Sequence, residues 1–127
     1  MRYLCMICHE QKALDSLSER EFDELVAESL AYDDELRNGA HYLYTGALQS
    51  VETSSTLRIQ SGKVLLTDGP FAETKEHLGG FIVIEARDLN EAIRLASKIP
   101  PARLGCVEVR PIRELEPRRD QPGLDDR

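Results

Sequence analysis

The order of the periodic segments constrains the fold of this chain more than any other feature of its sequence. An apolar run, an amphipathic helical pattern and a second apolar run occur in that order twice, and two short alternating segments separate the two groups. A strand–helix–strand unit places its helix on one face of a sheet. Two such units with an inserted hairpin predict one α+β domain, with both helices on the same face of a single sheet.

The first unit spans the N-terminal part of the chain. A continuous apolar run predicts a strand at Tyr3–Cys8. The segment Ser18-Glu19-Arg20-Glu21 has the spacing of a capping box, and the apolar positions after it recur at helical spacing. We expect this helix to end at Asn38-Gly39, because glycine tolerates the C-cap conformation. Aromatic and β-branched residues then predict a strand at His41–Leu48.

The inserted segment has the pattern of a β-hairpin. Thr56–Gln60 and Lys63–Thr67 alternate between apolar and polar residues on either side of Ser61-Gly62, a typical two-residue turn. The alternation predicts one apolar face, formed by Leu57, Ile59, Val64 and Leu66.

The second unit repeats the first in a shorter form. A strand is predicted at Gly80–Ala86, a helix from Asp88 to Lys98, and a last strand at Cys106–Ile112. We expect Leu89, Ala92, Ile93 and Ala96 on the inner face of the helix. In the last strand, Val107 and Val109 should point to one face, and Cys106, Glu108 and Arg110 to the other.

Without the hairpin, this order is that of a ferredoxin-like split βαβ fold. Both helices would cover one face of the sheet and leave apolar side chains bare on the other. A second copy of the chain is the simplest cover, and a cavity between the copies is a natural place for a small molecule. The domain is expected to span residues 1–113, and the charged, proline-containing residues 114–127 are expected to be a disordered tail.

Composition excludes several classes of partner. The net charge of −7 argues against nucleic acid, whose phosphates require a basic surface. No signal-peptide pattern and no apolar stretch long enough to span a membrane occur, so we expect a cytoplasmic protein without a membrane partner. Three cysteines are unlike a disulfide framework. The sequence contains no nucleotide-binding or zinc-hydrolase motif, and we expect neither cofactor nor metal.

The segment Cys5-Met6-Ile7-Cys8-His9 matches the C-x-x-C-H pattern of covalent haem attachment. In a strand, however, Cys5 and Cys8 project to opposite faces and cannot share one group. We therefore interpret both as buried thiols.

The loop before the second unit concentrates ionisable groups. Asp68-Gly69-Pro70 is typical of a turn, and Phe71 could anchor the loop to the core. Glu73, Lys75, Glu76 and His77 follow within five positions, which suggests either a site or a solvated surface.

Other candidates lie on the strands. His41 could transfer protons near pH 7. Tyr3, Tyr44, Glu108 and Arg110 could line the bare sheet face, where Arg110 could hold a carboxylate. The alternative is that Glu108 and Arg110 pair with each other or across a dimer.

Residues Asp68 to Glu76 read DGPFAETKE and are identical to the signature of the DGPFAETKE family, which belongs to the YCII-related group. The similarity extends through GGFIVIEARDLNEAIRLASKIP to VEVRPI, so it covers Arg2 to Ile112. The chain thus resembles proteins expected to form a dimeric α+β barrel, with two sheets facing each other across a cavity. Some members are proposed to be enzymes because of a His–Asp pair, and some of their genes lie beside extracytoplasmic-function sigma factors.

The sequence departs from the short YCII-like relatives in its first helix. Their proposed catalytic histidine corresponds to a position near Ser29, and Phe22–Arg37 contains no histidine.

Our leading hypothesis is a small-molecule enzyme with acid–base chemistry. Asp68 would be the base or orienting carboxylate, His41 or His77 its proton partner. Phe71, Glu73, Lys75, Arg110 and Tyr3 are the candidate ligand-binding residues. The alternatives are a regulatory ligand-binding module, linked through the resemblance to a sigma factor, and a structural dimer with an incidental groove.

Overall fold

A computed structural model describes residues 1–116. The part of the predicted disordered tail from residue 117 onward lies outside the described residues, and residues 112–116 have no regular secondary structure. The strands are β1 (Arg2–His9), β2 (Tyr42–Ala47), β3 (Ser55–Gln60), β4 (Lys63–Asp68), β5 (His77–Glu85) and β6 (Gly105–Pro111). The helices are α1 (Gln11–Asp15), α2 (Glu19–Asn38) and α3 (Leu89–Ala96), with 3-10 turns η1 (Val51–Thr53) and η2 (Pro100–Leu104).

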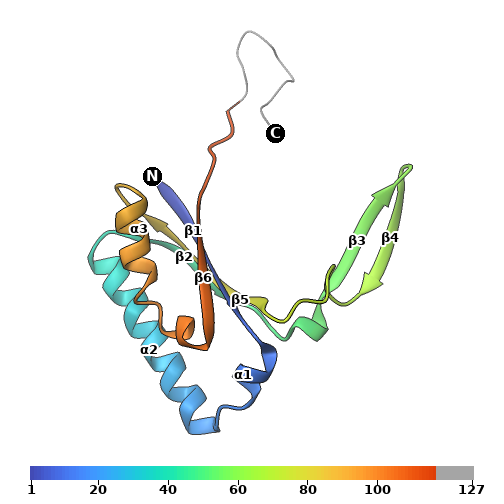
Figure 1. The fold of residues 1–127 in the computed structure, drawn as a ribbon. Helices are drawn as coiled ribbons and strands as arrows, with labels where there is room; N and C mark the ends of the chain where they lie inside the picture. The colour runs from blue at the N-terminus through green and yellow to red at the C-terminus, as the bar shows by residue number, and fades with distance from the viewer. Residues whose placement is uncertain (117–127) are drawn as a thin grey trace.

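The described strands form two separate sheets. Four of them pair in the order β2-β5-β1-β6, and each neighbouring pair is antiparallel. The strands β3 and β4 pair only with each other. Helices α2 and α3 lie on the same side of the four-stranded sheet (Figure 1). The predicted α+β class is confirmed.

Helix α2 begins where its sequence predicts. The backbone N–H of Glu21 donates to Ser18 Oγ at 3.1 Å, and the N–H of Ser18 donates to Glu21 Oε1 at 2.9 Å, so the capping box is complete. Near its C-terminal end, the hydroxyl of Tyr32 donates to the carbonyl of Leu95 at 2.6 Å. This buried hydrogen bond joins α2 to α3.

The core lies between the helices and one face of the sheet. Along β1, Tyr3, Cys5 and Ile7 are buried against the helices, whereas Cys8 lies half-buried on the opposite face. The predicted opposite orientation of Cys5 and Cys8 is confirmed. The prediction that Tyr3 lines the bare face is wrong, because Tyr3 pairs in register with Ile84 and shares its buried side of the sheet.

Two predictions for the second helix need correction. Helix α3 ends at Ala96 instead of Lys98, because the chain tightens and the N–H of Lys98 donates to Leu95 three residues back. Leu89 and Ile93 are half-exposed, although they were expected on the inner face. Leu95 is buried in the core instead, next to Tyr32 of α2.

The buried thiol of Cys5 should make stability depend on alkaline pH. Burial raises the pKa of Cys5 from 9.0 to about 11. Because the folded pKa is the higher one, this contribution is complete below pH 9 and is lost as pH rises to about 11. We expect the free energy of unfolding to fall by about 2 kcal/mol over this range. Urea titrations at both pH values should show the fall, and Cys5→Ala should reduce it. If Cys5→Ala shows the same fall, titration of Cys5 is not its cause. Burial also raises the pKa of Tyr32 to about 12, which would add a further loss of stability at higher pH.

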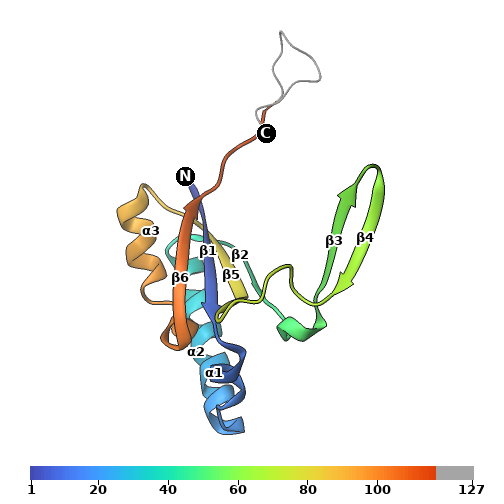
Figure 2. The same cartoon turned by 45° about the vertical axis from the view of Figure 1, so that its right-hand side comes forward.

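The hairpin β3–β4 projects from the body of the protein (Figures 1 and 2). The predicted turn is confirmed, since Ser61 and Gly62 have φ values of 51° and 75°. Leu57 pairs with Leu66 and Ile59 with Val64, so all four aliphatic side chains share one face. They are 59–70% exposed. We call residues 55–68 the arm. A two-stranded hairpin is marginally stable alone, and no described residue of the same chain covers this apolar face.

Candidate functional site

Two histidines meet at one end of the four-stranded sheet. His9 ends β1 and lies directly opposite His77, the first residue of β5. The register shifts between Ile7 and Cys8, which leaves Gly79 as an unpaired bulge. The ring of His9 lies across Gly79, where an added Cβ would come within 2.2 Å of His9 Nε2. Glycine is thus required for this histidine to occupy its place.

Hydrogen bonds fix the proton positions on both rings. The carbonyl of Glu10 lies 3.1 Å from His9 Nδ1 and can only accept, so Nδ1 is the donor. Thr74 Oγ1 donates its only proton to the carbonyl of Glu76 at 2.6 Å. It can therefore only accept at its 3.3 Å contact with His77 Nδ1. In the neutral form, each ring keeps Nε2 as a free base.

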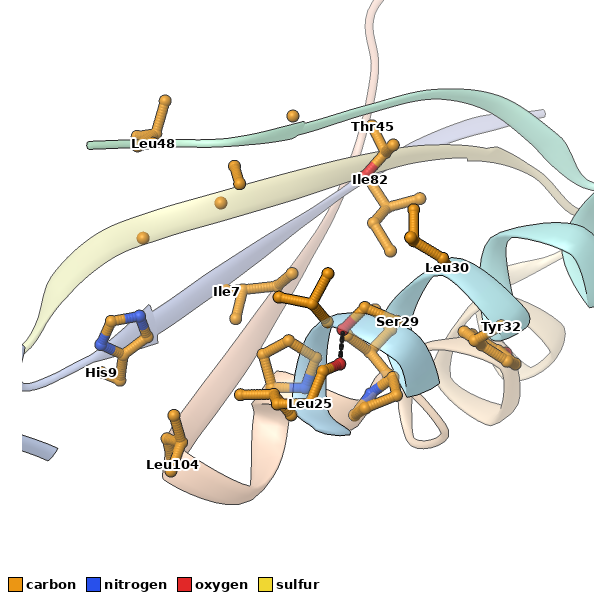
Figure 3. A pocket seen from close by; sticks show the side chains of 18 of the residues that line it. Ile7, His9, Leu25, Ser29, Leu30, Tyr32, Thr45, Leu48, Ile82 and Leu104 are labelled. Atoms are coloured by element: carbon orange, nitrogen blue, oxygen red, sulfur yellow. Dashed lines mark hydrogen bonds between the residues drawn. The ribbon is translucent and has the colours of Figure 1, made fainter. Parts of the chain in front are cut away.

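A cavity of about 310 Å³ opens beside His9 on the helix-covered side of the sheet. Figure 3 shows strands β1, β2 and β5 on one side of it and helix α2 on the other, with His9 and Tyr32 at opposite ends. Its lining is mainly aliphatic and includes Ile7, Leu14, Phe22, Leu25, Val26, Leu30, Leu48, Ile82, Ile99 and Leu104. A pocket of this size and character fits a small, largely apolar molecule.

Few polar side chains line the cavity. Ser29 Oγ donates to the carbonyl of Leu25 at 2.8 Å (Figure 3), and Thr45 Oγ1 donates to the carbonyl of Phe81 at 3.2 Å. Asp33 also lines the cavity, is only 6% exposed, and makes no hydrogen bond or ion pair with any described residue. Burial raises the pKa of Asp33 above its usual value, against the attraction of Arg37.

A smaller crevice of about 30 Å³ adjoins the same histidine. Its lining includes His9, His77 and Leu14, and His9 and Leu14 also line the larger cavity. His9 therefore lies between the apolar cavity and His77.

The signature segment is tied to this end of the sheet. Lys75 Nζ lies 3.4 Å from Glu10 Oε1, and Cys106 Sγ lies 3.9 Å from Glu76 Oε1. These contacts hold the segment beside the end of β1 and the start of β6. We call the group formed by His9, Thr74, His77 and the residues of these two contacts the histidine end.

The structure does not bring every predicted residue to the histidine end. Asp68 ends β4 at the base of the arm, opposite Ser55, and lines neither cavity. No hydrogen bond or ion pair of the Asp68 or Glu73 side chain occurs among the described residues. The prediction that Phe71 anchors the loop is wrong, because its side chain is 78% exposed.

His41 lies at the other end of the sheet. Its Nδ1 donates to the carbonyl of Glu85, the last residue of β5, at 2.8 Å, whereas His77 is the first residue of that strand. The two histidines that we considered as alternative proton partners are therefore separated by the length of a strand.

The open sheet face carries a pair of opposite charges. Arg110 donates to Glu108 in an ion pair, which confirms that these two residues pair with each other. Cys8 lies opposite Cys106 on this face, and the rings of Tyr44 and Phe81 stack with centroids 5.8 Å apart. Arg110 thus already has a carboxylate partner within the chain.

His9 and Asp33 were missing from the predicted site. In the sequence, His9 stood out only as part of the C-x-x-C-H segment. It follows Cys5 and Ile7 at two-residue steps along β1, so its side chain points to the same helix-covered face. Asp33 lies four residues after Ser29 and three before Leu36, so the helical spacing of the apolar positions could have placed it on the buried side of α2.

Comparison with known proteins identifies the family of this chain. The model of the YCII-related domain matches residues 1–116. An uncharacterized protein of Rhizobium meliloti (strain 1021) is 32% identical over 120 residues, which cover 88% of this chain and 93% of that protein. The fold is a small α+β domain with one helix-covered sheet. The chain belongs to the YCII-related family.

The described residues also limit two other kinds of site. None of their helices is both long and apolar enough to cross a membrane. No three of their His, Cys, Asp and Glu side chains are grouped so that they could hold a metal ion.

Proposed function

We propose that this protein binds a small molecule in the apolar cavity and transforms it by acid–base chemistry at the histidine end. The observation that carries the proposal is the position of His9, which lies 93% buried between the cavity and His77 with Nε2 available as a base. Histidine is suited to this work because its pKa lies near neutral pH.

His77 would act as the second proton-transfer group. Its Nδ1 is held by Thr74, a residue of the signature segment, and this leaves Nε2 to face a substrate. Asp68 stays a candidate orienting carboxylate, since it has no partner among the described residues and begins the signature segment. His41 and Tyr3 are not part of this proposal.

The acting unit in this proposal is a homodimer in the cytoplasm. Two ferredoxin-like sheets would face each other across their open sides to form a dimeric α+β barrel. The exposed apolar face of the arm supports this proposal.

Asparagine substitutions test the acid–base role. His9→Asn and His77→Asn keep a donor near the Nδ1 position but remove Nε2. Wild-type protein is incubated with pooled metabolites, and consumed compounds are identified by mass spectrometry. We expect each substitution to slow consumption by at least about 100-fold, the usual size of a general acid–base effect.

His41→Asn is the matched control for this experiment, because it removes a histidine from the opposite end of the sheet. We expect its rate to stay within threefold of wild type. Consumption that survives both His9→Asn and His77→Asn would overturn the proposal, and so would the absence of any consumed compound.

The mainly aliphatic lining of the cavity favours a second candidate, a non-catalytic ligand-binding or regulatory module, whose partner could be a sigma factor. This module would bind a compound from the same pool without forming a product. Native mass spectrometry of the retained compound distinguishes the two functions.

A further inference from the structure

Asp33 is the one acidic side chain that lines the apolar cavity, as far as the described residues show. It is 94% buried, whereas its neighbour Asp34 is exposed and pairs with Arg37 at 2.8 Å. The guanidinium of Arg37 also lies 4.1 Å from the ring centroid of Tyr42. The cation nearest to Asp33 in sequence is thus already engaged by two other groups.

Asp33 is 94% buried as a residue, yet its carboxylate oxygens still reach solvent, since none of the described side-chain oxygens is both buried and without a hydrogen-bond partner. A charged group with so little water around it favours a nearby counter-charge. Buried charges are usually paired or hydrogen-bonded, and Asp33 is neither within the described part of the chain. Position 33 would be filled by an aliphatic residue if packing of α2 were its only role, since aspartate is a poor helix former inside a helix. The described residues thus supply no hydrogen-bonded cation for this carboxylate, which leaves a place for a cationic group in the cavity.

We propose that the cavity binds a small organic amine, whose ammonium group pairs with Asp33 and whose apolar body lies between α2 and the sheet. This inference rests on the proposed function and names the substrate class of the same site. The volume of about 310 Å³ holds a molecule of on the order of ten non-hydrogen atoms, at roughly 30 Å³ for each water-sized group.

The lining selects an amine over other cations. Divalent metal ions require several oxygen ligands, and one carboxylate among aliphatic side chains does not supply them. A charge-assisted N–H to carboxylate hydrogen bond is about twice as strong as a neutral one, and a dry site strengthens it. Asp33 lies on α2 and His9 on β1, and both line the cavity, so the ammonium group would lie on the helix side. The other end of the ligand would then reach the proposed base.

Phenethylamine and its neutral counterpart 2-phenylethanol are suitable probes, because they have the same size and differ mainly in charge at pH 7. We expect isothermal titration of the full-length protein to show at least tenfold tighter binding of phenethylamine. Asp33→Asn should weaken phenethylamine binding at least tenfold and change 2-phenylethanol binding by less than threefold. Asp23→Asn removes the same charge from an exposed position of α2 outside the cavity lining and should leave both affinities within twofold.

Equal affinity of the wild-type protein for the two probes would overturn the proposal, and so would the failure of both to bind. An Asp33→Asn variant that folds and binds phenethylamine normally would also overturn it. If Asp33→Asn does not fold, the comparison of the two probes on the wild-type protein decides.

Further measurements separate failure of the proposed acid–base function from failure of the amine proposal. His41→Asn, at the opposite end of the sheet and outside the cavity lining, should leave phenethylamine binding within threefold. Amine binding through Asp33 without turnover of any compound would contradict the acid–base function and support the ligand class. Turnover that depends on both histidines, with no preference for amines, would support the acid–base function and contradict the ligand class.

Discussion

Replacing Ile59 and Val64 together by threonine is expected to raise the dissociation constant of the proposed homodimer by about a thousandfold. These residues form a cross-strand pair on the apolar face of the arm and are 70% and 64% exposed in one chain. Two side chains change in each arm, so four change in the dimer. At about 1 kcal/mol for each, the loss is about 4 kcal/mol, or roughly three orders of magnitude in affinity. Threonine keeps the strand propensity, so the hairpin itself should persist.

Arg58 and Leu65 provide a matched control for this substitution. They form the adjacent cross-strand pair on the other face of the same hairpin. Replacing both by threonine should change the dissociation constant by less than tenfold. Sedimentation velocity over a range of protein concentrations measures all three proteins. A monomeric wild type at micromolar concentration would refute the dimer. An equal effect of the two double substitutions would show that the apolar face is not the contact surface.

Gly105→Ala is expected to reduce the free energy of unfolding by about 3 kcal/mol or more. An added Cβ at Gly105 would lie 2.0 Å from the carbonyl oxygen of Cys8 and 2.9 Å from the Cα of His9. Both are backbone atoms of the paired strand β1, so the strands β1 and β6 must separate locally. Such overpacking typically costs about 1–3 kcal/mol, and a clash with backbone is at the upper end because no rotamer relieves it.

For a domain of this size, we expect the melting temperature of Gly105→Ala to fall by on the order of 10 °C. Gly62→Ala serves as the comparison, since nothing lies within 4 Å of its added Cβ. Gly62 has a φ of 75°, so its substitution should cost about 1 kcal/mol through backbone strain alone. Thermal unfolding followed by circular dichroism measures both. A Gly105→Ala variant as stable as Gly62→Ala would show that β6 does not approach β1 so closely.

Local chemistry was sufficient to predict the strands and the two longer helices, but not the five-residue helix α1. The capping box at Ser18, the glycine turn at Ser61-Gly62 and the alternation in β1 each involve residues a few positions apart. Their structures depend on hydrogen bonds and side-chain directions within one segment. These features could therefore be read without knowing which segments pair.

The candidate site depended on contacts between distant segments. His9 and His77 face each other only because the bulge at Gly79 shifts the register of β5 against β1. The expected placement of His77 in a loop was wrong for the same reason, since β5 begins three residues earlier than its apolar run at Gly80 indicates.

The sequence by itself determined the class of fold, the order of strands and helices along the chain, and the family signature, because periodicity and turn residues act over a few positions. Only the tertiary structure decided which ionisable groups meet. It placed His41 at the far end of the sheet, left the apolar face of the arm bare, and enclosed His9 and Asp33 in one cavity. The free volume of this cavity arises from the packing of α2 against strands that are remote in sequence, and no local pattern encodes it.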